Sequence, residues 1–300
     1  MSQPRLSVVI LARNEARDIG RCLASVAWCD EVVVVDDHSQ DATVEIARAW
    51  GARVCSHRFE SFAQQRNWAL ECADLRNPWV LMLDADEALT PVVQREILLA
   101  LSEPAASVAG FLMCRKTMFL GRWLRHADGF PVWIMRLVHR DRARFVDAGH
   151  GEVPAPPVDG VLRKIPEPFL HYPFGKGLSH WLARHNTYST REAELERDSP
   201  PEWRWRDLVA RDAPRRRRSL RNMARRLPLR PLLRFCHHYL WKRGFLDGRA
   251  GLAFSLLMAG YEAAIVLKRC EAELPAAEPA PTVVQPRWRK SEEPARVLPR

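Results

Sequence analysis

Three carboxylates directly follow a short apolar run in this chain: the run 80–83 leads into Asp84, Asp86 and Glu87. A run of this length and composition is typical of a strand that is buried on both faces. Open α/β sheets bind ligands beyond the carboxyl ends of such strands. Two carboxylates separated by one small residue can approach the same hard cation, and a nucleotide diphosphate would complete the coordination of Mg²⁺ or Mn²⁺. The pattern alone also fits a solvated loop, because so short a motif arises by chance about once in a chain of this length.

A second acidic cluster follows another predicted strand. The valine-rich stretch 31–35 ends at Asp36 and Asp37. If both strand ends border one crevice, the carboxylates require a cation or a hydrogen-bonding ligand between them. We expect Asp36 or Asp37 to accept a hydrogen bond from a base or a ribose, as acids after Rossmann strands do. The first turn reads Ala12-Arg-Asn-Glu15, and neither glycine-rich phosphate-binding motif occurs, so the diphosphate is assigned to a metal.

The first hundred residues alternate between predicted strands and helices. Strands are expected at 6–11, 31–35, 52–56 and 79–83, and helices at 19–26, from 41, at 61–72 and from 90. Asp41 is a plausible N-cap, and Thr90 followed by Pro91 is a typical helix start. Alternation at this spacing predicts a parallel sheet with right-handed crossovers.

The bulk composition fits one large domain, or one domain with an appendage. The chain has 300 residues, of which 47% are hydrophobic and 27% charged. Its 7 cysteines form no C-x-x-C pair, and scattered thiols in odd number indicate a reducing compartment. The apolar run 6–12 is too short for a signal segment. We therefore expect the catalytic part to be cytoplasmic.

Taken together, four segments resemble the family 2 glycosyltransferases with the GT-A fold: 6–15, 34–41, 65–70 and 83–87. Segments 59–67 and 136–145 are similar to the bacterial branch that includes lipopolysaccharide-core β-1,4-glucosyltransferases. The resemblance is strong over about residues 5–90 and continues more loosely to about 190. It implies a Rossmann-like, mixed but mainly parallel sheet flanked by helices.

The resemblance also implies roles for individual residues. Asp86 would hold Mg²⁺ or Mn²⁺, Asp37 would contact a uracil base, and Asp84 would approach the donor sugar or ribose. His171, after a strand-like run, could reach the metal or the diphosphate, although a structural role fits as well. The residues expected to bind the UDP-sugar are Ala12, Arg13, Glu15, Asp36, Asp37, Gln65, Arg66, Asn67, Asp84 and Ala85.

The segment 147–153 is expected to supply the catalytic base. Inverting transfer needs a carboxylate that takes the proton of the acceptor hydroxyl. The resembling branch carries a His-Glu pair here, whereas this chain reads His150-Gly-Glu152. We predict Glu152 as the base, with Asp147 as the alternative. His150 would position the base, bind phosphate or help the metal, or be an ordinary loop histidine.

Aromatic and polar residues later in the chain are candidates for the acceptor side. Trp123, His126 and Asp128 lie in a loop rich in Gly and Pro that could stack on a sugar. For the tryptophans of this loop, packing in the core or in a lid is the preferred interpretation. A helix is expected over 176–197, with Trp181, His185 and Tyr188 on one face. Packing of that face against the sheet is the preferred interpretation over a role beside the acceptor.

The C-terminal third is basic and then apolar. Ten arginines and one acid lie between 211 and 234, and the stretch 250–267 is strongly apolar apart from Ser255 and Glu262. We expect 205–268 to form interfacial or re-entrant helices on an anionic membrane surface. A solvated basic helix and a nucleic-acid site are the alternatives, and the apolar stretch disfavours both. The predicted regions are a catalytic domain at 1–199, a membrane-associating region at 200–270 and a disordered tail at 271–300.

The sequence thus predicts an inverting, metal-dependent transferase at the inner face of the plasma membrane. It would move a hexose, with glucose implied by the resemblance, from a UDP-sugar to a hydroxyl of a lipopolysaccharide-core or lipid-linked acceptor. A sugar nucleotidyltransferase is the second enzymatic interpretation, although residues 6–20 hold only Gly20 where it needs a glycine-rich signature. A non-catalytic membrane or nucleic-acid binding protein is the third interpretation.

Overall fold

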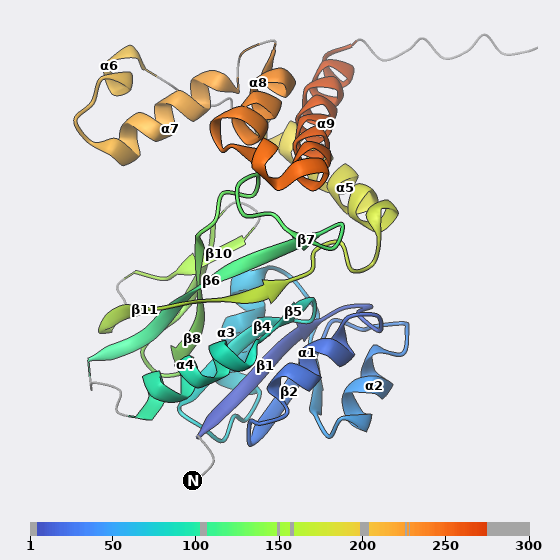
Figure 1. Cartoon of the computed structure of the whole chain (residues 1–300), viewed down its shortest axis with the longest axis vertical. Helices are drawn as coiled ribbons and strands as arrows, with labels where there is room; N and C mark the ends of the chain where they lie inside the picture. The colour runs from blue at the N-terminus through green and yellow to red at the C-terminus, as the bar shows by residue number, and fades with distance from the viewer. Residues whose placement is uncertain are drawn as a thin grey trace, which may run out of the picture.

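The computed structural model describes residues 5–102, 107–148, 151–156, 159–198, 204–225, 227 and 229–274. Strands and helices alternate through the first hundred residues, as the sequence predicts (Figure 1). The elements are β1 (Leu6–Ala12), α1 (Ile19–Val26), β2 (Glu31–Asp36), α2 (Thr43–Ala49), β3 (Arg53–Ser56), α3 (Phe62–Cys72), β4 (Trp79–Asp84), β5 (Glu87–Ala88) and α4 (Pro91–Ser102). Each predicted element is present, with bounds that differ by one or two residues.

The local signals that predict these helices are visible in their geometry. The apolar positions predicted for α1 (Ile19, Cys22, Leu23 and Val26) are its four buried residues. Ser61 is the N-cap of α3 and accepts a hydrogen bond from the backbone N–H of Gln64. The carboxylate of Asp41 accepts from the backbone N–H of Thr43, which begins α2. The N-cap of α2 is nevertheless Ala42, so the predicted cap at Asp41 is wrong by one residue, whereas the start of α3 is fixed by the side chain of Ser61.

The second half of the chain completes the sheet. Its strands are β6 (Val108–Phe119), β7 (Arg122–Trp123), β8 (Val132–His139), β9 (Phe145–Ala148), β10 (Gly151–Pro154) and β11 (Val161–His171). The main sheet runs β3-β2-β1-β4-β8-β6-β11-β5, and β9 and β10 form a separate antiparallel pair. β1 lies parallel to β2 and β4, whereas β8 is antiparallel to both β4 and β6. The predicted mixed, mainly parallel sheet flanked by helices is confirmed.

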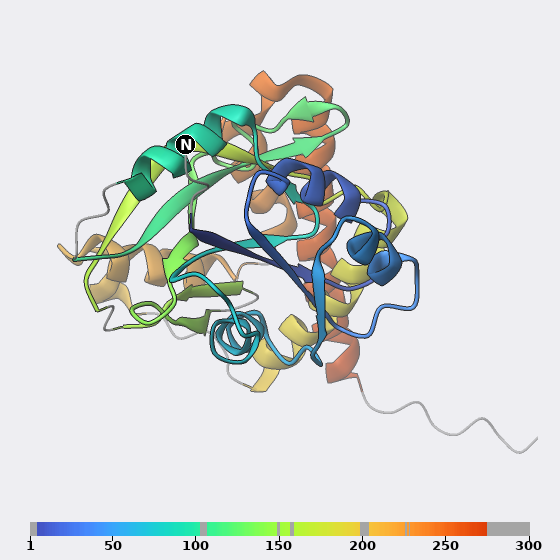
Figure 2. The same cartoon turned by 90° about the horizontal axis from the view of Figure 1, so that it is seen from below.

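Helices cover both faces of the sheet (Figures 1 and 2). On one face, α1, α2 and α4 pack against side chains such as Val8 and Ile10 of β1. On the other face, α3 packs against the alternate residues Val9 and Leu11. This alternation follows from the period of two in a strand. Because both faces are covered, the central strands are apolar throughout, and their polar groups lie at the strand ends.

A layer of helices, here called the helical cap, lies beside the carboxyl ends of the strands (Figure 1). It consists of α5 (Leu178–Asp198), α6 (Trp205–Leu208), α7 (Ala213–Ala224), α8 (Arg230–Cys236), η1 (His237–Trp241), η2 (Gly244–Asp247) and α9 (Gly248–Glu273). The helix predicted at 176–197 is thus present as α5, but it packs against α9 and not against the sheet. The predicted domain boundary at 199 falls between α5 and α9, and it stays a prediction.

The cap is attached to the strand layer by apolar and polar contacts. Phe119 and Leu124 form a small core with Phe254 of α9. Asp247 accepts hydrogen bonds from the backbone N–H groups of His126 and Ala127 at 2.9 and 2.7 Å. A carboxylate bound by backbone donors fixes the position of the chain on both sides of the contact. The cap is therefore held directly above the strand ends.

The apolar C-terminal helix is long and apolar enough, by length and composition, to cross a membrane. It packs on α5 and α8, however, and its Glu262 is buried and bonded to the buried Arg230. Arg230 also donates to Glu196 of α5 at 2.7 Å. The interfacial or re-entrant placement predicted for 205–268 stays a prediction, and within it Arg230 is an internal residue that does not face solvent. The predicted tail at 271–300 falls, beyond residue 274, outside the described residues.

Candidate active site

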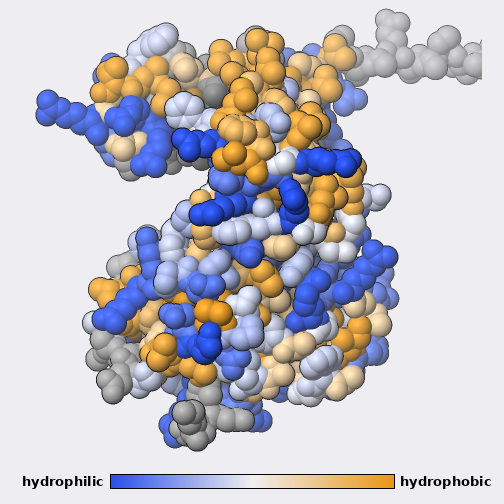
Figure 3. Space-filling model, in the orientation of Figure 1, coloured by the Kyte–Doolittle hydropathy of each residue, from blue (hydrophilic) through white to orange (hydrophobic). Residues whose placement is uncertain are grey.

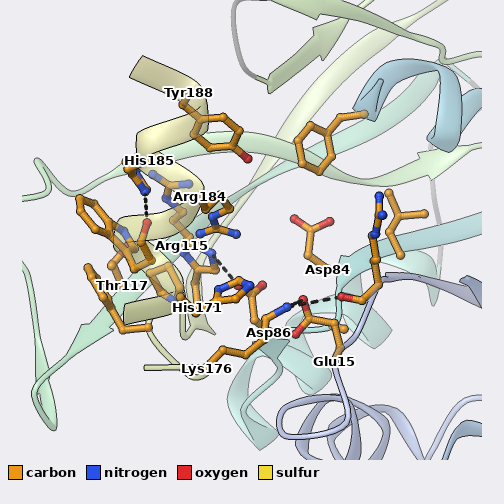
Figure 4. A pocket seen from close by; sticks show the side chains of 18 of the residues that line it. Glu15, Asp84, Asp86, Arg115, Thr117, His171, Lys176, Arg184, His185 and Tyr188 are labelled. Carbon is orange, nitrogen blue, oxygen red and sulfur yellow. Dashed lines mark hydrogen bonds and ion pairs between the residues drawn. The ribbon is translucent and has the colours of Figure 1, made fainter. Parts of the chain in front are cut away.

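A pocket of about 730 Å³ lies between the carboxyl ends of the strands and the helical cap (Figure 4). We call it the strand-end pocket. Asp37 after β2, and Asp84, Ala85 and Asp86 at the end of β4, line its sheet side. Both predicted acidic clusters therefore contribute to one crevice. Asp36 does not line the pocket, because it is buried and accepts bonds from the backbone and hydroxyl of Ser39.

Two buried arginines hold Asp84 in place. Arg66 of α3 donates to Oδ1 of Asp84 at 2.7 Å, and Arg136 of β8 donates to Oδ2 at 2.8 Å. Arg136 also donates to Glu87 at 2.7 Å, and both arginines donate to Oε1 of Glu152 at 2.9 and 3.0 Å. This Arg66–Arg136 cluster places two guanidinium groups among three carboxylates. Each charge is thereby paired, as burial requires.

The cluster gives its carboxyl groups different pKa values. Burial opposes ionisation of Asp84, but the facing Arg66 and Arg136 outweigh burial and hold its pKa below the ordinary value. Burial raises the pKa of Glu87 to about 7, against the opposing effect of Arg136. Asp84 is thus anionic and fixed in orientation, with both oxygens engaged by arginines. Asp86 is the carboxylate at this strand end that remains available for a cation.

The predicted metal ligands Asp86 and His171 face each other across the pocket. Oδ2 of Asp86 lies 3.7 Å from Nε2 of His171, which ends β11. Burial lowers the pKa of His171, so the imidazole is neutral and can act as a ligand. Within the described residues, no group of three or more His, Cys, Asp or Glu side chains could hold a metal ion. Two protein ligands fit a cation such as Mg²⁺ that takes further oxygens from substrate phosphates and water.

An ion pair closes the pocket beside this position. Nζ of Lys176 contacts Oε1 of Glu15 and donates to the carbonyl of Asn14 at 3.1 Å. Burial raises the pKa of Glu15 to about 7, although Lys176 acts in the opposite direction. The contact joins the first strand-to-helix turn to the loop before α5. It places the ammonium group of Lys176 beside the turn that follows β1, on that side of the pocket.

Of the other residues predicted to bind nucleotide, some line the strand-end pocket and others lie outside it. Arg13 pairs with Asp37 at 2.7 Å and Ala12 lines the pocket beside them. Gln65 also lines the pocket, with its Oε1 2.7 Å from Nδ1 of His57. Asn67 lies away from the pocket and exchanges two hydrogen bonds of 2.9 Å with the backbone of Phe145. Arg66 acts from beneath, through Asp84 and Glu152, without lining the pocket.

Neither carboxylate predicted as the base lines the pocket. Glu152 lies in β10 within the Arg66–Arg136 cluster, and Asp147 accepts at 3.3 Å from the backbone N–H of Ala63 at the start of α3. His150 falls outside the described residues. Asp128 does line the pocket, and its Oδ2 accepts from the hydroxyl of Thr117 at 2.7 Å. The assignment of Glu152 or Asp147 stays a prediction, and Asp128 is a third candidate.

Three arginines that the sequence did not indicate also line the pocket: Arg115 of β6, and Arg184 of α5 and Arg234 of α8 in the cap. The pocket is lined as well by Trp181, His185 and Tyr188 of α5, and Figure 4 labels His185 and Tyr188 beside Arg115 and Arg184. That aromatic face of α5 was expected to pack against the sheet, and it borders the pocket instead. The available signal was the helical spacing of Trp181, His185 and Tyr188. The arginines gave no comparable signal, because only the fold brings β6, α5 and α8 together.

A comparison of the sequence with models of protein families identifies the family of this domain. Residues 7–154 match the model described as Glycosyl transferase family 2. The chain carries a family 2 glycosyltransferase domain. The matched residues span the Rossmann-like half, the Arg66–Arg136 cluster and the β9–β10 pair. α5 and the rest of the cap, which close the strand-end pocket, lie beyond the match.

Relatives of this glycosyltransferase resemble it over different lengths. It is 24% identical over 263 residues to the lipopolysaccharide core biosynthesis glycosyltransferase LpsC of Rhizobium meliloti (strain 1021), covering 85% of this chain and 90% of that protein. It is 39% identical over 94 residues to an uncharacterized glycosyltransferase of Rickettsia bellii (strain RML369-C), but the match covers only 31% of each chain.

Solved structures provide weaker likenesses. The mannosyltransferase PcManGT from Pyrobaculum calidifontis, solved in complex with GDP-Man and Mn²⁺, is 18% identical, with a TM-score of 0.46 over 91% of this chain and 89% of that chain. Glucosyl-3-phosphoglycerate synthase from Mycobacterium tuberculosis, solved with Mn²⁺, UDP and glucosyl-3-phosphoglycerate, is 20% identical. Its TM-score is 0.35, over 46% of this chain and 57% of that chain.

Proposed function

We propose that this glycosyltransferase moves a hexose from a UDP-sugar, with inversion, to a hydroxyl of a lipopolysaccharide-core or lipid-linked acceptor. The observation that carries the proposal is the convergence of Asp37, Asp84 and Asp86 at the strand ends of a family 2 domain, beneath a cationic cap. Acids on one side and cations on the other suit a ligand that combines a nucleoside with a diphosphate. Glucose as the hexose rests on the family resemblance alone.

The donor is proposed to lie along the sheet side of the pocket. Asp37 would accept from the base, with Arg13 holding that carboxylate in position. Asp84 would accept from a hydroxyl of the ribose or the sugar, since its oxygens are already oriented by arginines. Asp86 and His171 would hold Mg²⁺ or Mn²⁺. The bound cation would neutralise charge that develops on the departing diphosphate.

The acceptor is proposed to enter from the cap. Full-length similarity to a lipopolysaccharide core biosynthesis protein supports an envelope saccharide as its class. We propose Asp128 as the base that takes the acceptor proton, because it is a carboxylate in the pocket with one oxygen fixed by Thr117. Glu152 and Asp147 are the alternatives that the sequence names. We further propose that the exposed cap residues hold the enzyme at the cytoplasmic face of the membrane.

Calorimetry of nucleotide binding tests the donor assignment. Wild-type protein should bind UDP more tightly than GDP or CMP, and the binding should require Mn²⁺ or Mg²⁺. Asp86→Ala should abolish the metal dependence and reduce transfer close to zero, with an unchanged melting temperature. Asp141→Ala is the matched control, because the side chain of Asp141 is 70% exposed and lies outside the pocket. Folded wild-type protein that binds none of these nucleotides would overturn the proposal.

A further inference from the structure

A second cavity, of about 870 Å³, lies between α5 and α9 in the helical cap. We call it the α5–α9 groove, and its walls include Leu178, Leu182, Ala253, Leu256, Leu257 and Gly260. Its volume falls within the range of about 300–1,000 Å³ that is usual for small-molecule sites. Leu178, Leu182 and Leu256 are 47%, 48% and 56% exposed. The groove is thus open and apolar along both helices.

The groove adjoins the strand-end pocket and shares part of its lining. Phe174, Trp181, His185 and Tyr261 line both cavities. Trp181 stacks on His185 and on Phe174, so a wall of rings separates the polar chamber from the apolar one. A ligand that reaches the reacting centre from the cap must pass these rings. One that extends beyond them meets hydrocarbon side chains.

The junction of the two cavities carries positive charge. Arg184 follows Trp181 by one helical turn on α5, and Arg234 of α8 lines the same pocket. The Nε of Arg184 is buried and has no hydrogen-bond partner among the described residues, whereas the Nε of Arg234 lies 3.5 Å from a carboxylate oxygen of Glu262. A buried guanidinium donor without a partner favours an anionic ligand. Figure 4 shows the guanidinium of Arg184 directed into the pocket, near Arg115.

From these features we infer that the acceptor is an anionic amphiphile. Its phosphate or carboxylate contacts Arg184 and Arg234, and its hydrocarbon chain lies in the α5–α9 groove. The charge at the junction, the apolar walls beyond it and the shared ring lining select one molecule with both properties. Figure 3 shows apolar surface over α8 and α9, and α9 forms one wall of the groove. The inference rests on the proposed function and specifies the chemical class of its acceptor.

Binding of soluble amphiphiles tests the inference without relying on transfer activity. The probes are n-decyl phosphate, n-octyl phosphate, the nonionic n-decyl glucoside and inorganic phosphate, each titrated calorimetrically below its micelle concentration. Burial of one methylene strengthens binding about fourfold. The two chains differ by two methylenes, so we expect decyl phosphate to bind about sixteenfold more tightly than octyl phosphate. It should also bind at least tenfold more tightly than the glucoside or inorganic phosphate.

Two substitutions test separately the binding of the hydrocarbon chain and of the anionic head group of the probe. Gly260→Leu fills the groove, because a Cβ at Gly260 meets no atom within 4 Å, and leucine is compatible with the helix. It should weaken decyl phosphate at least tenfold. Gly20→Leu is the matched control, since Gly20 is also helical with open space at its Cβ and lies outside both cavities. Arg184→Gln should weaken decyl phosphate at least tenfold and the glucoside little, and Arg184→Lys should restore part of the affinity.

UDP titration of the same proteins keeps the two proposals distinguishable. UDP binding with no binding of decyl phosphate overturns the acceptor inference and leaves the donor proposal intact. Equal affinity for inorganic phosphate and decyl phosphate would show that the protein binds only the anion and not the hydrocarbon chain. That result also overturns the acceptor inference. Competition between UDP and decyl phosphate would assign Arg184 to the donor diphosphate instead. If Gly260→Leu fails to fold, Leu256→Gln on the exposed groove wall replaces it, and wild-type affinity there contradicts the inference.

Discussion

At the scale of single residues, the two buried arginines decide what each acid of the site can do. Arg66 and Arg136 each donate to one oxygen of Asp84, so this carboxylate is fixed in orientation. Asp86, two residues on, faces His171 instead. Two acids of one short motif therefore have different surroundings. The same arginines hold Glu152, which links the β9–β10 pair to the end of β4.

Removing one arginine should be costly to stability. Arg136→Met leaves Glu87 buried without its cation, and loss of one partner of a buried ion pair typically costs about 3–5 kcal/mol. We expect a decrease of that size in the free energy of unfolding, measured by urea denaturation at pH 7. Arg163→Met is the control, because Arg163 is exposed in β11. The additional change Glu87→Leu should recover part of the loss, and a decrease below about 1 kcal/mol in Arg136→Met would contradict the pairing.

The identity of the base can be decided by kinetics. Asp128→Asn should lower kcat by about 10²–10⁴-fold, the usual contribution of general-base catalysis, with UDP affinity unchanged. Glu152→Gln should chiefly lower stability, because Glu152 is bonded to two buried arginines. Asp147→Asn should have little effect on kcat, since its carboxylate lies outside the pocket and accepts from the backbone N–H of Ala63 in the first turn of α3. A loss of kcat confined to Glu152→Gln would restore the prediction from the sequence and exclude Asp128.

At the scale of elements, the site depends on how the cap is attached to the strands. η1 places His238 against the loop before β8, where Nδ1 lies 2.7 Å from the carbonyl oxygen of Ala127. The ring also packs edge-on against Phe254 of α9. Asp247 binds the neighbouring backbone N–H groups from the other side. A change in these contacts would move α5 and α8, and with them the arginines of the pocket.

Acid should weaken this attachment. Burial lowers the pKa of His238 to about 4 in the folded protein, with Arg234, Lys242 and His237 adding repulsion and the bond to Ala127 acting against it. The unfolded chain, with a pKa of about 6.5, binds the proton first, so stability falls as the pH drops from about 6.5 to about 4. We expect this loss to reach up to about 3 kcal/mol, measured by chemical denaturation across that range.

The variant His238→Asn isolates this contribution. An asparagine amide can donate to the carbonyl of Ala127 from nearly the same position, but it does not titrate. The variant should therefore lose less stability than the wild type between pH 6.5 and 4. Parallel stability curves for the two proteins would show that the dependence arises elsewhere.

At the scale of the whole molecule, a large apolar surface lies on the cap (Figure 3). Trp205, Leu240 and Trp241 are exposed, as are Arg215, Arg216 and Arg217 of α7. Not every arginine of the basic stretch is free for a membrane. Arg215 pairs with Asp207 at 2.7 Å although its side chain is 57% exposed. Arg225 pairs with Glu192, Arg230 is buried, and Arg234 lines the pocket. The proposed membrane contact therefore concentrates on α7 and the exposed apolar side chains.

Vesicle binding tests that arrangement. Each basic residue near an anionic bilayer contributes about 1 kcal/mol, so changing Arg215, Arg216 and Arg217 to Gln should weaken binding to phosphatidylserine vesicles about a hundredfold in co-sedimentation. The triple change of Arg48, Arg95 and Arg163, which are exposed on the catalytic part, is the matched control. Equal retention of both triple variants on the vesicles would remove the electrostatic part of the proposal.

The sequence by itself determined the Rossmann-like half. Local signals predict the elements of this half: the apolar positions predict α1, and Ser61 as N-cap predicts the start of α3. The acids after β2 and β4 mark the carboxyl ends of those two strands. Because parallel strands share one carboxyl edge, these local signals were enough to bring Asp37, Asp84 and Asp86 together. A resemblance spread over residues 6–87 supplied the family.

Only the tertiary structure decided the other side of the site. Arg115, Arg184 and Arg234 lie 69 and 50 residues apart in sequence, and no local pattern states that β6, α5 and α8 meet. The chain likewise gave no sign that Arg66 and Arg136 share three carboxylates, or that the aromatic face of α5 meets a pocket and α9 instead of the sheet. Such contacts depend on packing between distant segments, where burial and charge pairing, not spacing, select the partners.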